Sequence, residues 1–452
     1  MSSLTRYTVP VWVLLGLACN ETPLMAPAGS EPAFAISDAA HASGNAHFYF
    51  LPPMVSASSF TGAFDPTQTP VVQICELAGP VCQLPLIAQF TMTGGADSEA
   101  VRLDAAAEQY IVNWHTGQFE LDVTKTYRIR VQAHDLELGF ADVGLVASGR
   151  DLANVDPQLV AVVNGRTLPI KFRIEVGAVS CGPEVTVDAN NLVLALQAGR
   201  LPSGDAGGLG FFQGTQVLFA GGVAYGTSGT DVVVGYATLD DLQHLDLTSP
   251  VCSVRRGPDQ ETFATVQPLP EIAGPPGLVV TQRSLAFGTA PDDDYVLLVY
   301  TITNTGPAPL ANLFAGLIMD WDLFFDGGAV NDLALFNSVL QIAEVTERSE
   351  PHVVGVAPIV SAPLNYAGYV APWAPPPNDP TTPAGYFALL SGGIQPAPVG
   401  RADVRHVVSL GPATLPAGAS RTYTFALVGG VDQADFEANV QAARAMAGVL
   451  GF

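Results

Sequence analysis

The chain of 452 residues is acidic and sparsely charged: 42 Asp and Glu stand against 18 Lys and Arg, which gives a formal net charge of −24. Because 48 % of the residues are hydrophobic, the chain can bury large cores, and this excludes a protein that is disordered throughout. The negative charge argues against nucleic acid as a partner, since nucleic-acid binding depends on cationic neutralisation of phosphates.

The N-terminus has the features of a secretory signal peptide over residues 1–18. Arg6 is the only charge before the apolar segment Val9–Ala18, which is shorter than the roughly 20 apolar residues that span a bilayer. The segment ends in Leu15-Gly16-Leu17-Ala18-Cys19, which resembles the lipobox of bacterial lipoproteins, although Gly16 stands where Leu is usual. The resemblance implies cleavage before Cys19, a diacylglycerol on its thiol, and, with Asn20 next, sorting to the outer membrane. The alternative is an ordinary secretory peptide followed by a chance cysteine.

Residues 19–44 are rich in Ala, Pro, Ser and Gly, which predicts a flexible tether. Beyond it, four cysteines remain, an even number that suits disulfides in an oxidising compartment. Four cysteines allow three pairings. Cys75 and Cys82 flank a turn-rich Leu77-Ala78-Gly79-Pro80 sequence, so the most economical pairing is Cys75–Cys82 with Cys181–Cys252. A zinc site is not expected, because the chain has no CxxC motif and no nearby pair of histidines.

Residues 45–179 are predicted to form a small β-sandwich of immunoglobulin-like type. In Tyr127–Gln132, Tyr, Ile and Val share one face while two Arg and a Gln share the other, which is the pattern of a half-buried antiparallel strand. The expected strands are short and separated by turn signals: Val71–Cys75, Leu86–Thr93, Tyr110–Trp114, Tyr127–Ala133 and Ile170–Val176.

Residues 180–452 are predicted to form a larger two-sheet sandwich with a C-terminal helix. Tyr295–Asn304 is apolar on both faces until its end, as expected of a central strand covered on both sides. Asp432 is the expected N-cap of the helix, in which Phe436, Val440 and Ala443 share one face. The other expected strands are Leu192–Gln197, Thr215–Phe219, Asp231–Thr238, Ala311–Trp321, Val404–Leu410 and Arg421–Val428.

An acidic segment follows one of these strands and is a candidate Ca²⁺ site. In a strand, Asp320 and Asp322 point to the same side, and the turn after them brings Asp326 or Asp332 alongside. Several carboxylates on one rim suit Ca²⁺, which takes six to eight oxygen ligands. The alternative is a polar strand end with solvated carboxylates.

A long segment rich in aromatic residues and proline contains Tyr366, Tyr369 and Trp373. Exposed on a sandwich, these rings would stack on sugars or bind another protein. The alternative, which we favour, is that they pack back onto their own sheet.

Catalytic motifs are weak. Gly226–Thr230 resembles the nucleophile motif of subtilisin-like proteases only superficially, and a hairpin turn before Val232 is the better interpretation. His115 and His406 are expected to be structural.

Two resemblances to known domains follow from longer stretches. Thr301–Gly306, Ala315–Asp322 and Leu415–Gly418 resemble a β-rich module found after the catalytic domain of some bacterial secreted subtilisin-like proteases, over roughly residues 210–450. The protease domain is absent, so catalysis does not carry over. Tyr110–Gly117 with Asn164–Phe172 resembles a recurrent domain of uncharacterised bacterial secreted proteins, which implies a compartment and no activity.

The sequence therefore favours a non-catalytic cell-envelope lipoprotein of the outer membrane, facing the periplasm or the surface, with a role in adhesion, scaffolding or ligand binding. Its expected partners are the membrane, through the lipid, and a polysaccharide or another envelope protein. Two alternatives stay open. One is a carbohydrate-active enzyme or carbohydrate-binding protein on the large sandwich, and the other is an accessory protein to a secreted protease.

Overall fold

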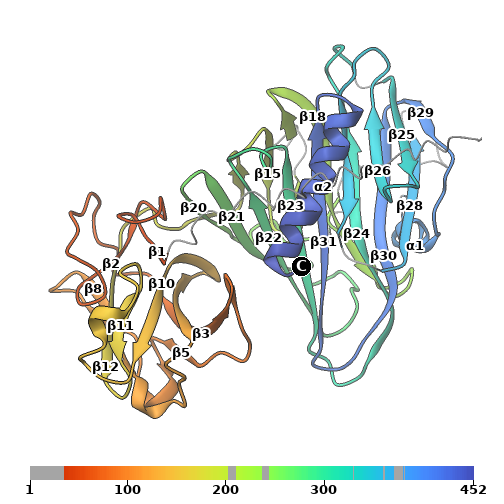
Figure 1. The fold of residues 1–452 in the computed structure, drawn as a ribbon. Coiled ribbons are helices and arrows are strands. Elements are labelled where there is room, and N and C mark those ends of the chain that lie inside the picture. Colours follow the sequence, from red (N-terminus) through yellow and green to blue (C-terminus); the bar gives the residue numbers. More distant parts are fainter. Residues whose placement is uncertain are drawn as a thin grey trace, which may run out of the picture. The chain divides into compact units, whose positions relative to one another are not determined.

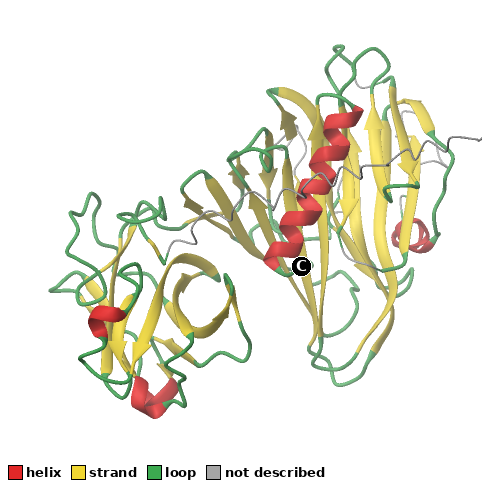
Figure 2. Cartoon of the chain, in the orientation of Figure 1, coloured by secondary structure: helices red, strands yellow, loops and turns green. Residues whose placement is uncertain are grey.

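The computed structural model describes residues 35–201, 210–236, 244–328, 330–359, 362–370, 380 and 382–452. Strands dominate these residues, and the longest helix is the C-terminal one (Figure 2). The expected all-β fold built from sandwiches is confirmed. No helix of the described residues has both the length and the apolarity to cross a membrane. The predicted signal peptide and Cys19 lie outside the described residues.

Two sheets form the first sandwich. The eight-stranded sheet has the order β1-β10-β9-β3-β5-β6, with β11 on β10 and β4 on β3. Its strands are β1 (Ile36–Ser37), β3 (Val71–Ala78), β4 (Val81–Cys82), β5 (Ala88–Thr91), β6 (Gly94–Gly95), β9 (Thr126–Ala133), β10 (Leu136–Val146) and β11 (Val160–Val163). The four-stranded sheet has the order β2-β12-β8-β7 and consists of β2 (Phe48–Phe50), β7 (Arg102–Asp104), β8 (Gln109–His115) and β12 (Thr167–Ile174).

Alternating side chains explain why these segments form a sandwich. Along β9 every second residue is buried, so Tyr127, Ile129 and Val131 enter the core while Arg128 faces outward. There Arg128 pairs with Asp142 on β10 at 2.7 Å. A strand with this period-two pattern buries one face only, which fits the outer layer of a sandwich.

The tether predicted for residues 19–44 ends earlier than expected. Ile36 and Ser37 pair antiparallel with Ala141 and Phe140, and Asp38 is fully buried. The Oδ2 atom of Asp38 accepts a hydrogen bond from the Phe50 amide at 3.0 Å. This buried carboxylate fixes residues 35–44 to the first sandwich, whereas their small-residue composition alone suggested a linker.

The larger sandwich also consists of two sheets. The ten-stranded sheet has the order β13-β20-β21-β22-β23-β31-β27-β26-β25-β29. Its strands are β13 (Ser180–Gly182), β20 (Val251–Arg256), β21 (Asp259–Val266), β22 (Leu278–Ala286), β23 (Tyr295–Asn304), β25 (Asp332–Asn337), β26 (Ile342–Thr346), β27 (Val353–Pro358), β29 (Val399–Ala402) and β31 (Ser420–Gly430).

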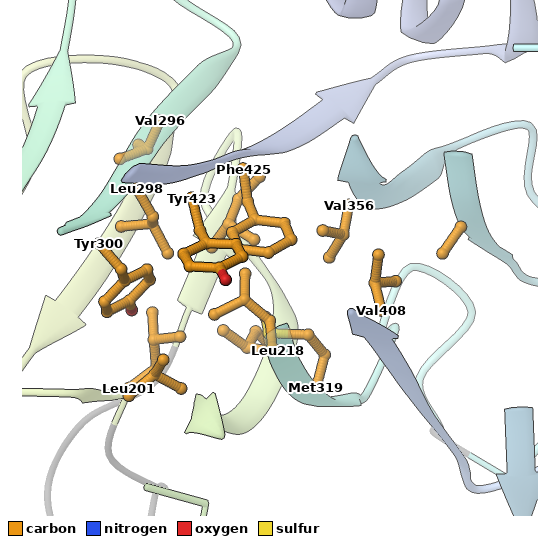
Figure 3. Close-up of a cluster of buried hydrophobic side chains, with 14 of the residues drawn as sticks. Leu201, Leu218, Val296, Leu298, Tyr300, Met319, Val356, Val408, Tyr423 and Phe425 are labelled. Atoms are coloured by element: carbon orange, nitrogen blue, oxygen red, sulfur yellow. The ribbon is translucent and has the colours of Figure 1, made fainter. Parts of the chain in front are cut away.

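The nine-stranded sheet has the order β14-β15-β17-β18-β24-β30-β28, with β16 and β19 also on β18. Its strands are β14 (Val185–Val187), β15 (Leu192–Leu196), β16 (Arg200–Leu201), β17 (Gly210–Phe212), β18 (Thr215–Gly226), β19 (Val233–Val234), β24 (Leu310–Trp321), β28 (Leu364–Val370) and β30 (Val404–Leu415). The main core lies between these two sheets. Figure 3 shows Tyr300, Tyr423 and Phe425 of the ten-stranded sheet close together in it, with Leu218 and Met319 from the nine-stranded sheet.

Two helices cover outer faces of the large sandwich. The expected C-terminal helix α2 (Gln433–Leu450) lies along β23 and β31 (Figure 1). It buries Phe436, Val440 and Ala443. Its N-cap is Asp432, as predicted, and the side chain accepts a hydrogen bond from the Asp435 amide at 2.9 Å. The second helix, α1 (Pro383–Ser391), was not predicted. It packs on the outer face of the nine-stranded sheet with Tyr386 and Leu390 buried.

Both expected disulfides are present, Cys75–Cys82 and Cys181–Cys252. The first closes the β3–β4 hairpin, in which Leu77 lies opposite Cys82. The second joins Cys181 and Cys252, which lie directly opposite one another on β13 and β20. The four cysteines of the described chain are therefore all oxidised.

Candidate functional site

Four aspartates meet where the chain passes between the two sheets of the large sandwich. Asp320 lies near the end of β24, and Asp322 follows that strand. The chain then enters the ten-stranded sheet at Asp332, the first residue of β25. Asp403 separates β29 of the ten-stranded sheet from β30 of the nine-stranded sheet. The crossings from β24 to β25 and from β29 to β30 thus place their acidic residues at one rim.

Three of these residues form a tight group. One carboxylate oxygen each from Asp320, Asp322 and Asp403 lies within 4.8 Å of the others. Strand pairing explains the proximity, because Asp320 is opposite Arg405 and Trp321 is opposite Val404. The amide of Asp322 continues the strand direction by donating to the Val217 carbonyl oxygen at 3.0 Å. Asp320 is only 2 % exposed, whereas Asp322 and Asp403 are half-buried.

Asp320 is held by two neighbours through one of its oxygens. The Tyr236 hydroxyl donates to Oδ2 at 2.8 Å, and Nε of Arg405 lies 3.0 Å from the same atom. Oδ1 of Asp320 has no hydrogen-bond partner among the described residues. The guanidinium of Arg405 also lies 5.4 Å from the centre of the Tyr236 ring. One side of the Asp320 carboxylate is therefore fixed and the other is unpartnered.

Asp332 is fully buried and lies close enough to Asp322 and Asp403 for their charges to affect it. Its Oδ2 accepts from the Leu323 amide at 3.1 Å, and its Oδ1 has no hydrogen-bond partner in the described part of the chain. Gly400 of β29 lies against the Asp332 backbone, where a Cβ would collide with the Asp332 carbonyl oxygen. The φ of Gly400 is +121°, a value that favours glycine, so this residue allows the two strands to approach.

Burial shifts the ionisation of these carboxyl groups. It raises the pKa of Asp320 to about 6, where Asp403 adds to the shift and Arg405 opposes it. Burial, Asp320 and Asp403 together raise the pKa of Asp322 to about 7. The pKa of Asp332 rises to about 8 through burial and the nearby carboxylates of Glu347, Asp322 and Asp403. Each shift reflects the cost of holding negative charge in a buried site where other carboxylates are close.

The structure brings together some of the predicted acidic residues and not others. Asp320 and Asp322 lie on the same side as predicted, and Asp332 lies alongside. Asp326 is exposed and bonded elsewhere, since its Oδ2 accepts from the Ser349 hydroxyl at 2.7 Å. Asp403 was not among the predicted residues, because it reaches the group only through the pairing of β24 with β30. A signal was present, because both predicted strands have an Asp next to the end that pairs.

Two of the three residues of the candidate aromatic surface pack back onto their own sheet, which is the alternative favoured from the sequence. Tyr366 and Tyr369 lie in strand β28 and are 0 % and 7 % exposed. The Tyr366 ring stacks on Phe336 with the ring centres 5.2 Å apart. Both tyrosines pack onto their own sandwich because β28 is an integral strand of the nine-stranded sheet. Trp373 lies outside the described residues.

The side chains considered for catalysis have structural partners. Ser228 lies in the turn between β18 and β19, where its hydroxyl is 3.0 Å from that of Thr230. His406 is fully buried, and its Nε2 accepts from Nε1 of Trp321 at 3.1 Å. His115 lies 2.8 Å from the Thr167 hydroxyl and 3.0 Å from a Glu99 carboxylate oxygen.

Comparison with known proteins identifies no family for this chain. No protein-family model and no curated protein matches it. A bacterial glucoamylase solved with acarbose is 6 % identical over 59 % of this chain, with a TM-score of 0.34, and the match spans 34 % of the glucoamylase. A GalM/aldose epimerase homologue from C. elegans is 7 % identical over 56 % of this chain and 100 % of its own length, with a TM-score of 0.31. Likenesses this weak carry no argument about activity.

Proposed function

We propose that this chain is an exported, non-catalytic protein of the bacterial cell envelope, held on the outer membrane by a lipid at Cys19. The observation that carries the proposal is the pairing of the other four cysteines in two disulfides. Structural disulfides belong to oxidising compartments and are rare in the cytosol. Their formation leaves Cys19, directly after an apolar segment of signal-peptide length, as the one cysteine available for lipid.

A role in binding or scaffolding is favoured over catalysis by the partners of the polar side chains. Ser228 is bonded within a turn, and His406 is neutral in the core because burial lowers its pKa to about 3. The burial of Tyr366 and Tyr369 removes two of the three rings on which a sugar-stacking surface was expected to depend. We therefore favour a protein partner or a structural role in the envelope over a carbohydrate ligand.

The resemblance of residues 210–450 to a module of secreted proteases suits the same role. Such a module is exported as part of a larger protease, and here the module-like sandwich follows a second sandwich in place of a protease domain. An accessory function beside a secreted protease is the form of this proposal that the resemblance supports.

Lipid labelling in a Gram-negative host tests the anchor. Cells expressing the full chain are grown with an alkyne-tagged fatty acid, and the inner- and outer-membrane fractions are then separated. We expect label on the wild-type chain in the outer-membrane fraction and none on a Cys19→Ser variant, which should be recovered in the soluble periplasmic fraction. A Cys75→Ser/Cys82→Ser double variant is the matched control and should keep the label. An unlabelled, soluble wild-type chain would overturn the proposal.

A further inference from the structure

The rim where the two sheets of the large sandwich are joined has the spacing of a single-ion site. Oxygens of Asp320, Asp322 and Asp403 lie within 4.8 Å of one another. Calcium–oxygen bonds are about 2.3–2.6 Å long, so two oxygens on opposite sides of one ion are about 5 Å apart. One ion can therefore contact all three carboxylates without a change in the backbone.

Unpartnered buried oxygens are an independent sign of a missing ligand. Oδ1 of Asp320, a residue that is 2 % exposed, lacks a hydrogen-bond partner in the described part of the chain. The same holds for Oδ1 of the fully buried Asp332, which is not a member of the close group of three. Buried polar atoms are nearly always satisfied in folded proteins, because an unsatisfied one costs free energy. A cation bound by the group of three would give Oδ1 of Asp320 a partner.

The charge and chemistry of the group indicate which ion fits. Among the described residues of the group, carboxylates outnumber the one guanidinium, that of Arg405, so a cation would reduce the repulsion between them. All the candidate ligands are carboxylate oxygens, the donors of hard cations such as Ca²⁺. Asp322 and Asp403 are half-buried, so an ion can enter from solvent and keep water ligands.

We propose that Asp320, Asp322 and Asp403 bind one calcium ion that fastens the two sheets of the large sandwich. Asp320 and Asp322 belong to the crossing that leaves β24 of the nine-stranded sheet. Asp403 belongs to the crossing that returns from β29 of the ten-stranded sheet. A shared ion joins the two crossings and offsets the repulsion between their carboxylates. This inference is independent of the lipid anchor.

Direct binding tests the site. The purified full chain, stripped with EDTA, is titrated with Ca²⁺ by calorimetry and with Tb³⁺ by luminescence, for which Tyr236 and Trp321 are nearby sensitisers. We expect one calcium per chain and displacement of Tb³⁺ by Ca²⁺. Mutation of a residue that only orients a metal ligand typically lowers the affinity for the metal about 10–100-fold. Asp322→Asn and Asp403→Asn should therefore each weaken calcium binding at least about tenfold.

Asp326→Asn is the matched control, since Asp326 lies in the same segment but is exposed and bonded elsewhere. Its calcium affinity should equal that of the wild type. Should an Asp322 or Asp403 variant fail to fold, as judged by circular dichroism, the wild-type titration alone still decides. A wild-type chain that binds neither Ca²⁺ nor Tb³⁺ overturns the proposal, as does an Asp322→Asn/Asp403→Asn variant that folds and binds calcium like the wild type.

Limited trypsin digestion tests the fastening. Arg401 is exposed in β29, two residues before Asp403, and Arg348 is exposed beside Glu347. Calcium should slow cleavage after these two arginines in the wild type and have no such effect in the Asp322→Asn/Asp403→Asn variant. Cleavage after the exposed Arg150 of the first sandwich is the internal control and should not respond to calcium. If calcium binds but does not slow cleavage after Arg401, the ion does not fasten the two sheets, and only the cation site stands.

Discussion

Where β24 pairs with β30, the two faces of the nine-stranded sheet bury polar side chains in different ways. Neighbouring residues on β24 and β30 point to opposite faces, so Asp320 meets Arg405 on one face while Trp321 meets His406 on the other. On the first face a negative and a positive group are buried together and a tyrosine hydroxyl completes the pair. On the second face, His406 is kept neutral and accepts a single hydrogen bond.

The difference shows what burial permits. A buried charge needs an opposite charge nearby, and removing one partner of the pair strongly destabilises the fold. A buried imidazole avoids that cost by giving up its proton. The first face therefore keeps charge, which a ligand can use, and the second keeps a neutral core. Variants on the two faces should behave differently.

Arg405→Leu should have the largest effect. It leaves Asp320 buried without its cationic partner, and breaking such a pair costs about 3–5 kcal/mol. Urea unfolding at neutral pH in EDTA measures the loss. The double variant Asp320→Asn/Arg405→Leu also removes the carboxylate of residue 320, so it should be more stable than Arg405→Leu. A single variant within about 1 kcal/mol of the wild type would contradict our view of the first face.

Tyr236→Phe should destabilise the protein by about 1.5–3 kcal/mol, the range for a hydrogen bond to a charged group. The hydroxyl that is removed lies 2.8 Å from Oδ2 of Asp320. The same unfolding measurement applies, and circular dichroism should show an unchanged strand content. A loss no greater than that of the equivalent change on the second face, Tyr366→Phe, would be evidence against a charged acceptor at Asp320.

The burial of neutral His406 predicts that the protein loses stability in acid. Burial lowers its pKa from 6.5 to about 3 in the folded protein, so the unfolded chain binds the proton first as the pH falls. The stability due to the neutral ring is complete above pH 6.5 and is lost progressively between about pH 6.5 and 3. At pH 5, the free energy of unfolding should have fallen by roughly 2 kcal/mol. Urea unfolding between pH 7 and 5 measures it. A His406→Gln variant lacks the imidazole, so the difference in free energy of unfolding between the wild type and this variant should become smaller in acid. A difference that does not change with pH would show that His406 does not titrate as described.

Tyr366→Phe should have the smallest effect. The Tyr366 hydroxyl is buried in the core between the sheets and has no hydrogen-bond partner among the described residues. Its removal should leave the free energy of unfolding within about 0.5 kcal/mol of the wild type or raise it slightly. Thermal unfolding checks this. A clear loss of stability would reveal a polar partner for this hydroxyl on the second face.

Elements with a strong local pattern were predictable from sequence. The predicted strand Tyr295–Asn304 has the bounds of β23, and its two apolar faces meet the core on one side and α2 on the other. Asp432 and the spacing of Phe436 and Val440 located α2. Each of these signals lies within a stretch shorter than twenty residues.

Features that depend on distant pairing were not predictable. Asp403 joins Asp320 and Asp322 through the register of β24 and β30, which no local pattern specifies. Tyr369 was not included in any predicted strand, although it belongs to β28, because the segment around it is rich in proline. Helix α1 was missed because its apolar residues show no single face, although Thr382 followed by Pro383 is a recognisable helix start.

The place of β31 in the ten-stranded sheet has a consequence for the export proposed above. This strand is inserted between β23 and β27, so Tyr295 pairs with Val428 across more than a hundred residues of chain. The sheet stays in two pieces until the chain as far as Gly430 is available, and contacts at such separation form slowly. A chain that crosses a membrane through a translocon must do so unfolded, and this strand order keeps the large sandwich open until nearly all of it has passed.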